Sequence, residues 1–208
     1  MTVEVRHFEA FHRDLTLRPL RAAQAMAAHA DLRRILRADP NLARWAIETF
    51  VQGSYSHGTV LRPRPGQGAF DVDIVLSMDC SLGRCRERAP QEVVGLVANI
   101  LERIPGYEDR VRRRDRCVRI HIASDCRLDV MPCHCVGGVP QGPIEMPSRR
   151  ADRWQTAHPR DLARWYVSRN GATDGRFIRV AKMMRQWKAV HLPLGGPPSV
   201  VLDVMLGT

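Results

Sequence analysis

Three aspartates lie where a strand pattern would bring their carboxylates together. The segment 70–78, FDVDIVLSM, alternates apolar and polar residues, so Asp71 and Asp73 share one face of an expected strand, about 7 Å apart. A second expected strand, 127–131, carries Asp129 between apolar neighbours. Carboxylates are the natural protein ligands of hard divalent cations. The pattern therefore predicts that Asp71, Asp73 and Asp129 bind two Mg²⁺ (or Mn²⁺) ions.

A site of this kind suits phosphoryl transfer from a triphosphate to a hydroxyl group. Two ions roughly 4 Å apart can activate the attacking oxygen and steady the leaving pyrophosphate. The protein then has to position the reactants in line and neutralise their charge. We expect Asp71, Asp73 and Asp129 to serve as the catalytic carboxylates of such a reaction.

A Gly-Ser pair precedes the carboxylates in the chain. Gly53 and Ser54 follow the expected strand 46–52, where a glycine lets the backbone approach a phosphate and the serine offers a hydroxyl and amides. Alone, such a pair is a weak signal, and a lone Asp-x-Asp is more often a solvated strand edge. Their order on strands of the right phase makes the combination much more specific.

The remaining segments define the elements that must position these residues. The periodicity predicts four helices and four strands. The helices are expected over 19–37 and 90–104, from Pro159 onward and over 176–190, and the strands over 46–52, 70–78, 117–122 and 127–131. Residues 61–69 and 136–149 are rich in Gly and Pro and are expected to be a loop and a connection. The predicted fold is α+β and bilobal: an N-terminal helix and a mixed-sheet catalytic lobe over 1–150, then a helical lobe over 151–208.

The last of these helices has two expected stripes. Phe177, Ala181, Met184 and Trp187 form an apolar stripe, and Lys182 belongs to the polar one. The tryptophans of the second half are expected in the core. For Lys182 and Arg185 the alternative is that both side chains face solvent.

Composition narrows the class of partner. The formal charge of +10 favours a polyanion, and nucleoside triphosphates, RNA and DNA fit it equally, with a solvated basic surface as the bland alternative. No apolar run reaches the length of a membrane span, and the first residues lack a signal-peptide pattern, so no membrane partner and a cytoplasmic location are expected. The six cysteines are expected to be reduced thiols, because nothing in the sequence points to export. Structural zinc is disfavoured, because Cys133-His134-Cys135 lacks the paired ligands of a zinc site.

The sequence resembles the nucleotidyltransferase superfamily of poly(A) polymerases and DNA polymerase β. It is most similar to its bacterial CD-NTases, relatives of cyclic GMP-AMP synthase and oligoadenylate synthase. The similarity covers nearly the whole chain from Phe50 onward. It rests on QGSYSHGTVLRP (52–63), FDVDIVL (70–76), CVRIHIASDCRLDVMP (117–132), WQTAHPRDLARWY (154–166) and IRVAKMMRQWK (178–188).

The resemblance implies a two-lobed enzyme with its active site between the lobes. It implies metal binding by the three aspartates, Asp129 as base for the attacking hydroxyl, and triphosphate contacts from Gly53 and Ser54. Lys182 and Ser199 correspond to a basic residue and a serine that contact phosphate in the family. Such enzymes join nucleoside triphosphates such as ATP and GTP into a cyclic di- or oligonucleotide, which in bacteria usually activates an antiviral effector.

Departures from the family limit what carries over. Val200 stands where animal relatives have an aromatic residue that stacks on the base, so stacking is expected from elsewhere, with Tyr55 as the candidate. The segment after Ser199 is short compared with family members, so the helical lobe is expected to be incomplete. The zinc-bearing insertion of the animal DNA sensor has no counterpart, so no DNA activator is implied. A regulatory protein partner stays unidentified.

Two other functions stay open at this point. The chain could transfer a single nucleotide to RNA, protein or a small molecule, or it could be an inactive module that binds nucleotides or RNA through its arginines. The three carboxylates disfavour the inactive module, because a binding protein has no need to hold repelling charges together.

Overall fold

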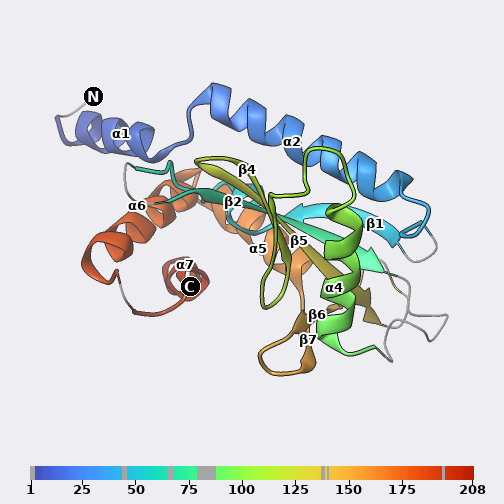
Figure 1. Cartoon of the computed structure of the whole chain (residues 1–208). Coiled ribbons are helices and arrows are strands. Elements are labelled where there is room, and N and C mark those ends of the chain that lie inside the picture. Colours follow the sequence, from blue (N-terminus) through green and yellow to red (C-terminus); the bar gives the residue numbers. More distant parts are fainter. Residues whose placement is uncertain are drawn as a thin grey trace.

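The computed structural model describes residues 3–43, 46–64, 68–78, 88–136, 139, 141–193 and 195–208. Across these residues a seven-stranded sheet forms the centre of the molecule (Figure 1). Its strands are β1 (Ala46–Gln52), β2 (Phe70–Met78), β3 (Val111–Arg113), β4 (Val118–Ala123), β5 (Cys126–Cys135), β6 (Ile144–Ser148) and β7 (Arg153–Ala157).

The sheet is mixed, as predicted. Its strands run in the order β1-β2-β5-β4-β3, and β6 pairs with both β5 and β7. Only the β2–β5 pair is parallel among these ladders, and the others are antiparallel. The parallel pair places the two aspartate-bearing strands side by side at the centre of the sheet.

Helices surround the sheet. They are α1 (Val3–Leu15), α2 (Pro19–Ala38), α3 (Gly53–Ser56), α4 (Pro90–Leu101), α5 (Pro159–Ala172), α6 (Arg176–His191) and α7 (Ser199–Gly207). Three of them, α2, α4 and α5, have a proline in the first turn, where its missing N–H leaves no partner unsatisfied. No helix among the described residues combines the length and apolarity that crossing a bilayer requires.

The main core lies on one face of the sheet, beneath α2 and α4. Alternate residues of β2, β4 and β5 point into it together with aliphatic residues of both helices. These include Val72, Ile74, Leu76, Val118, Ile120, Leu128, Val130, Leu32, Leu36, Val93 and Val97, all fully buried. The same alternation directs the residues between them, including the aspartates, to the opposite face of the sheet.

Six elements differ from the sequence-based expectation. Part of the expected connection 136–149 is strand β6, and β7 continues the sheet to Ala157. Helices α1, α3 and α7 and strand β3 were not predicted either. Strand β6 of the β6–β7 hairpin contains Pro147, and a proline within a segment argues against predicting it as a strand. The division at residue 150 stays a prediction, although β7 and contacts between α1 and α6 cross it.

The expected stripes of α6 were partly wrong. Trp187 is 47% exposed, while Lys182 and Gln186 are buried beside Phe177 and Ala181. Lys182 faces inward because α1 and the turn after it cover that side of α6.

The cysteines that the structure describes are free and buried, namely Cys117, Cys126, Cys133 and Cys135. Cys80 and Cys85 lie outside the described residues.

Candidate active site

The three predicted carboxylates meet on one face of the sheet. Asp73 of β2 and Asp129 of β5 are direct partners in the parallel ladder, so their Cα atoms are neighbours across the strand spacing of roughly 4.8 Å. Asp71 lies two residues earlier on β2 and shares the face. Two strands of matched register therefore bring all three side chains together.

Two arginines neutralise part of this acidic cluster, and sequence reasoning missed both. Arg119 of β4 is the ladder partner of Asp129 and binds it with two hydrogen bonds, Nε to Oδ1 at 2.8 Å and Nη2 to Oδ2 at 2.7 Å. Its Nη2 also lies 3.4 Å from Oδ2 of Asp71. Arg127 of β5 donates from Nε to Oδ1 of Asp71 at 2.7 Å and from Nη2 to the carbonyl of Ala69 at 2.8 Å.

Asp73 is the least compensated of the three. No described residue donates a hydrogen bond to it or forms an ion pair with it, whereas both partners have a guanidinium. The pKa of Asp73 is raised to about 7, mainly by burial and then by the charges of Asp129 and Asp71, while the charge of Arg119 acts in the opposite direction. The cluster therefore has unbalanced negative charge next to Asp73.

Gly53 sits directly against this carboxylate. It has φ +74°, and a β-carbon at this position would meet Oδ2 of Asp73 at 2.1 Å. Only glycine accepts both the left-handed backbone and this approach. The sequence predicted that Gly53 contacts phosphate. The structure shows that the neighbouring carboxylate of Asp73 also requires a glycine at this position.

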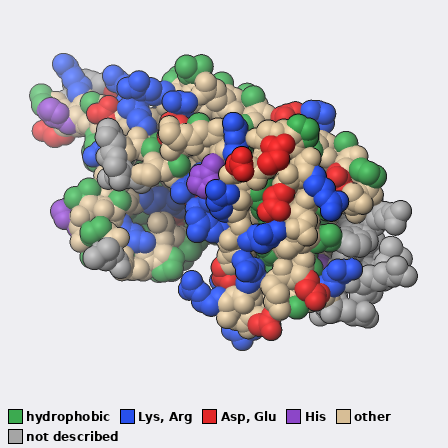
Figure 2. Space-filling model, viewed as in Figure 1, with side chains coloured by type: hydrophobic (Ala, Val, Ile, Leu, Met, Phe, Trp, Pro, Cys, Tyr) green, Lys and Arg blue, Asp and Glu red, His purple; other side chains and the backbone are tan. Residues whose placement is uncertain are grey.

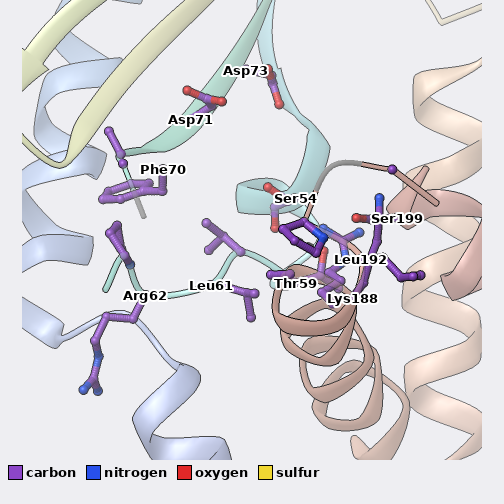
Figure 3. A pocket seen from close by; sticks show the side chains of 18 residues that line it. Ser54, Thr59, Leu61, Arg62, Phe70, Asp71, Asp73, Lys188, Leu192 and Ser199 are labelled. Atoms are coloured by element: carbon purple, nitrogen blue, oxygen red, sulfur yellow. Dashed lines mark hydrogen bonds between the residues drawn. The ribbon is translucent and has the colours of Figure 1, made fainter. Parts of the chain in front are cut away.

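A cavity of about 820 Å³ opens beside the acidic cluster (Figure 3). Its lining includes Asp71 and Asp73 of β2, Ser54 of α3, Arg185 and Lys188 of α6 and Ser199 of α7, together with apolar residues. Figure 3 shows Ser54 in the short helix α3, between the β2 carboxylates and Ser199. The cavity thus combines acidic groups from β2 with basic groups and hydroxyls from the helices.

Ser54 is fixed by the turn that follows it. Its carbonyl accepts hydrogen bonds from the amides of Thr59 and Val60 at 2.9 and 3.0 Å, so the chain folds back around residue 54. Ser199 is the first residue of α7. The structure therefore brings Ser54 and Ser199 to the same cavity as Asp71 and Asp73, and places Asp129, only 6% exposed, behind Arg119.

Lys182 does not reach the cavity. It is 6% exposed, its ammonium donates to Oγ1 of Thr16 at 3.2 Å, and burial lowers its pKa. The cations that line the cavity from α6 are Arg185 and Lys188, three and six residues further along the helix. The predicted phosphate contact of Lys182 stays a prediction, while two other cations of the same helix line the cavity.

Tyr55 is also turned away from the cavity. Its hydroxyl donates to the carbonyl of Ala22 in α2 at 3.3 Å, and its ring packs against the main core and the edge of His29. The suggestion that Tyr55 stacks on a base is therefore wrong in this arrangement, because α2 occupies its face.

A buried polar network joins the turn after α3 to the helical part. Asp203 of α7 is fully buried and accepts hydrogen bonds from the hydroxyl of Tyr166 and the guanidinium of Arg185. His57 stacks on Tyr166 with ring centroids 4.2 Å apart. Burial lowers the pKa of His57 to about 4, with the charge of Arg185 as the next cause. Asp203 thus fixes Arg185, which also lines the cavity.

The residues fit divalent cations by donor chemistry. Three carboxylates are the hard ligands that Mg²⁺ and Mn²⁺ prefer, and a dication would relieve their mutual repulsion. As the described side chains lie, however, no group of three acidic, histidine or cysteine residues is arranged to hold a metal ion. In this arrangement Arg119 donates a hydrogen bond to each oxygen of Asp129. The metal site stays a prediction.

The fold is that of the CD-NTase nucleotidyltransferases. The chain superimposes on CdnG of Bradyrhizobium diazoefficiens in complex with GTP with a TM-score of 0.76 and 17% identity, covering 96% of this chain and 68% of that one. It matches E. coli MS115-1 CdnC with ATP with a TM-score of 0.78 and 16% identity, covering 97% and 64%.

The family described as "Second Messenger Oligonucleotide or Dinucleotide Synthetase domain" matches residues 1–170, and the chain belongs to it. A cyclic AMP-AMP-AMP synthase of Acinetobacter sp. is 28% identical over 185 residues, which cover 86% of this chain. The chain spans about half the length of that relative, 51%. The family and fold predicted from the motifs are therefore confirmed.

Proposed function

We propose that the chain is a metal-dependent nucleotidyltransferase that condenses nucleoside triphosphates into a cyclic di- or oligonucleotide second messenger and releases pyrophosphate. The observation that carries the proposal is the arrangement of Asp71, Asp73 and Asp129 on one sheet face beside a cavity that cationic side chains also line. Membership of the synthetase family, with a cyclic oligonucleotide synthase among its relatives, supports the same reaction.

The three aspartates hold the divalent cations, which polarise the reacting phosphate and neutralise the leaving pyrophosphate when bound. Asp71 and Asp73 project from one strand, so their relative position is set by the backbone of β2. Asp129, on the neighbouring strand, is the group that accepts the proton of the attacking hydroxyl. Gly53 allows the carboxylate of Asp73 to stand where a side chain would displace it.

The basic and hydroxyl side chains of the cavity bind the triphosphate. Lys188 and Arg185 supply positive charge, and Ser54 and Ser199 supply hydroxyl donors. Asp203 and Tyr166 hold the guanidinium of Arg185 in place. At about 820 Å³ the cavity falls in the range of small-molecule sites and has room for a nucleoside triphosphate.

The proposal is tested by product analysis. Purified protein is incubated with Mg²⁺ or Mn²⁺ and labelled ATP, GTP, CTP and UTP, treated with phosphatase, and analysed by mass spectrometry. A phosphatase-resistant cyclic product supports the proposal. Label transferred to added RNA, to protein or to a small molecule would support single-nucleotide transfer instead, and nucleotide binding with no product would indicate an inactive module. Protection of bacteria against phage, lost with the product, would extend the proposal to antiviral signalling.

A further inference from the structure

The contacts of Asp129 involve Arg119, a residue of β4 outside the acidic cluster. Arg119 lies directly opposite Asp129 in the antiparallel β4–β5 ladder, and its side chain is only 16% exposed. A planar guanidinium bound through two parallel hydrogen bonds fixes the orientation of the carboxylate. The hairpin therefore holds Asp129 in a defined rotamer.

The same contacts compete with a metal ion. Each oxygen of Asp129 accepts one hydrogen bond from Arg119, which uses one of its two lone pairs and sets a positive charge against any cation that approaches the carboxylate. Among the described residues, no group of three acidic, histidine or cysteine side chains is arranged to hold a metal ion. Arg119 also approaches Asp71, one of the two carboxylates that line the cavity. One guanidinium thus contacts two of the three carboxylates that would hold the cations.

We propose that Arg119 is a displaceable counterion: it holds Asp129 in place before divalent cations arrive and is released from it when they bind. Arg119 is then a positioning residue that sets the metal affinity of the site. This inference rests on the proposed function, because it requires cations at the carboxylates. A consequence is that the released guanidinium, beside Asp71 at the edge of the cavity, favours an anionic substrate once the metal is bound.

Mn²⁺ alone is the probe. Its dissociation constant is measured for the full chain without nucleotide by the electron paramagnetic resonance of free Mn²⁺, for wild type, Arg119→Gln and Arg112→Gln. Arg112 is a matched control, because it is the β3 ladder partner of Arg119 but donates to the carbonyl of Val111 and to no carboxylate among the described residues. We expect Arg119→Gln to bind Mn²⁺ roughly 5- to 150-fold more tightly, the range of a typical coupling between two ligands, and Arg112→Gln to stay within about 2-fold of wild type.

Equal or weaker Mn²⁺ binding by Arg119→Gln overturns the inference, as does an equal gain in both variants, which would reflect charge alone. Asp73→Asn separates this failure from that of the proposed function. If wild type and Asp73→Asn bind Mn²⁺ equally, the carboxylates are not the metal site and the proposed function fails.

A second readout needs no stable glutamine variant. In wild-type protein labelled with ¹⁵N-arginine, the Nε–H resonance of Arg119, assigned by its loss in Arg119→Lys, is followed during a titration with diamagnetic Mg²⁺. Release from Asp129 is expected to shift this resonance and to speed its exchange with water, while that of Arg112 stays in place. An unmoved Arg119 resonance at saturating Mg²⁺ overturns the proposal.

Discussion

Gly53 and Asp73 lie in such close contact that a β-carbon on residue 53 would stand 2.1 Å from Oδ2 of Asp73. The two residues come from different elements, one from the start of α3 and the other from the middle of β2. The glycine thus links the turn that offers Ser54 to the strand that offers the carboxylates.

Replacing Gly53 by alanine should damage activity more than stability. The added methyl group must displace Asp73, and a misplacement of this size at a reacting centre lowers turnover on the order of 100-fold. The positive φ adds about 1 kcal/mol of destabilisation. Gly106→Ala is the control, because it has φ +86° with no atom within 4 Å of the added carbon. Turnover and urea melts of both variants check this. Equal turnover in the two would show that the contact with Asp73 is unimportant.

Substitution of Lys188 should affect substrate binding, whereas substitution of Lys182 should affect the stability of the fold. Lys188 lines the cavity, whereas Lys182 is buried against Thr16. Losing a charge-assisted contact to phosphate weakens binding by about 1.5–3 kcal/mol, so Lys188→Gln should raise the KM for nucleotide by about 10-fold or more with an unchanged melting temperature. Lys182→Gln should change the melting temperature and leave KM near the wild-type value. The reverse pattern would restore Lys182 as the phosphate ligand.

Asp203 should stabilise the fold, and its loss should also affect the active site through Arg185. It is fully buried and is shared by Arg185 and Tyr166. Asp203→Ala leaves a buried guanidinium without its carboxylate and should destabilise the protein by about 3–5 kcal/mol. Tyr166→Phe removes one hydrogen bond and should cost about 1–2 kcal/mol. Chemical denaturation measures both, and an Asp203→Ala loss no larger than that of Tyr166→Phe would contradict this role.

The His57 site should make stability depend on acid pH. Its pKa is lowered from 6.5 to about 4 in the folded state, mainly by burial, so the unfolded chain binds the proton more strongly. Stability is therefore lost as pH falls from about 6.5 towards 4, by up to about 3 kcal/mol. His57→Phe keeps a ring against Tyr166 and should remove this dependence. Urea melts at pH 4.5 and 7 compare the variant with wild type, and the exposed His191→Gln should behave as wild type does. Parallel profiles for His57→Phe and wild type would contradict the assignment.

The sequence predicted the parts of the site that lie within single strands. The alternation of 70–78 placed Asp71 and Asp73 on the face away from the core, and the structure confirms it. The pairing of Asp73 with Asp129 depends on the parallel register of β2 and β5, which strand periodicity does not fix.

Other residues depend on contacts between distant elements. Arg119 could have been found, since a tight hairpin centred near residue 124 pairs it with Asp129. The inward turn of Lys182 could not, because it follows from α1 covering α6, and nothing in the amphipathic pattern of 176–190 indicates that neighbour. The strands β6 and β7 were hidden by the Gly and Pro residues around them.

The central claim is that the three carboxylates catalyse nucleotidyl transfer. The most direct measurement is pyrophosphate release from nucleoside triphosphates with Mg²⁺ or Mn²⁺ by wild type and Asp73→Asn, with circular dichroism to confirm that both are folded. Loss of one metal ligand should lower the rate by about 1000-fold or more, and the cyclic product should disappear with it. An Asp73→Asn protein that is folded and keeps more than about a tenth of the wild-type rate would contradict the account.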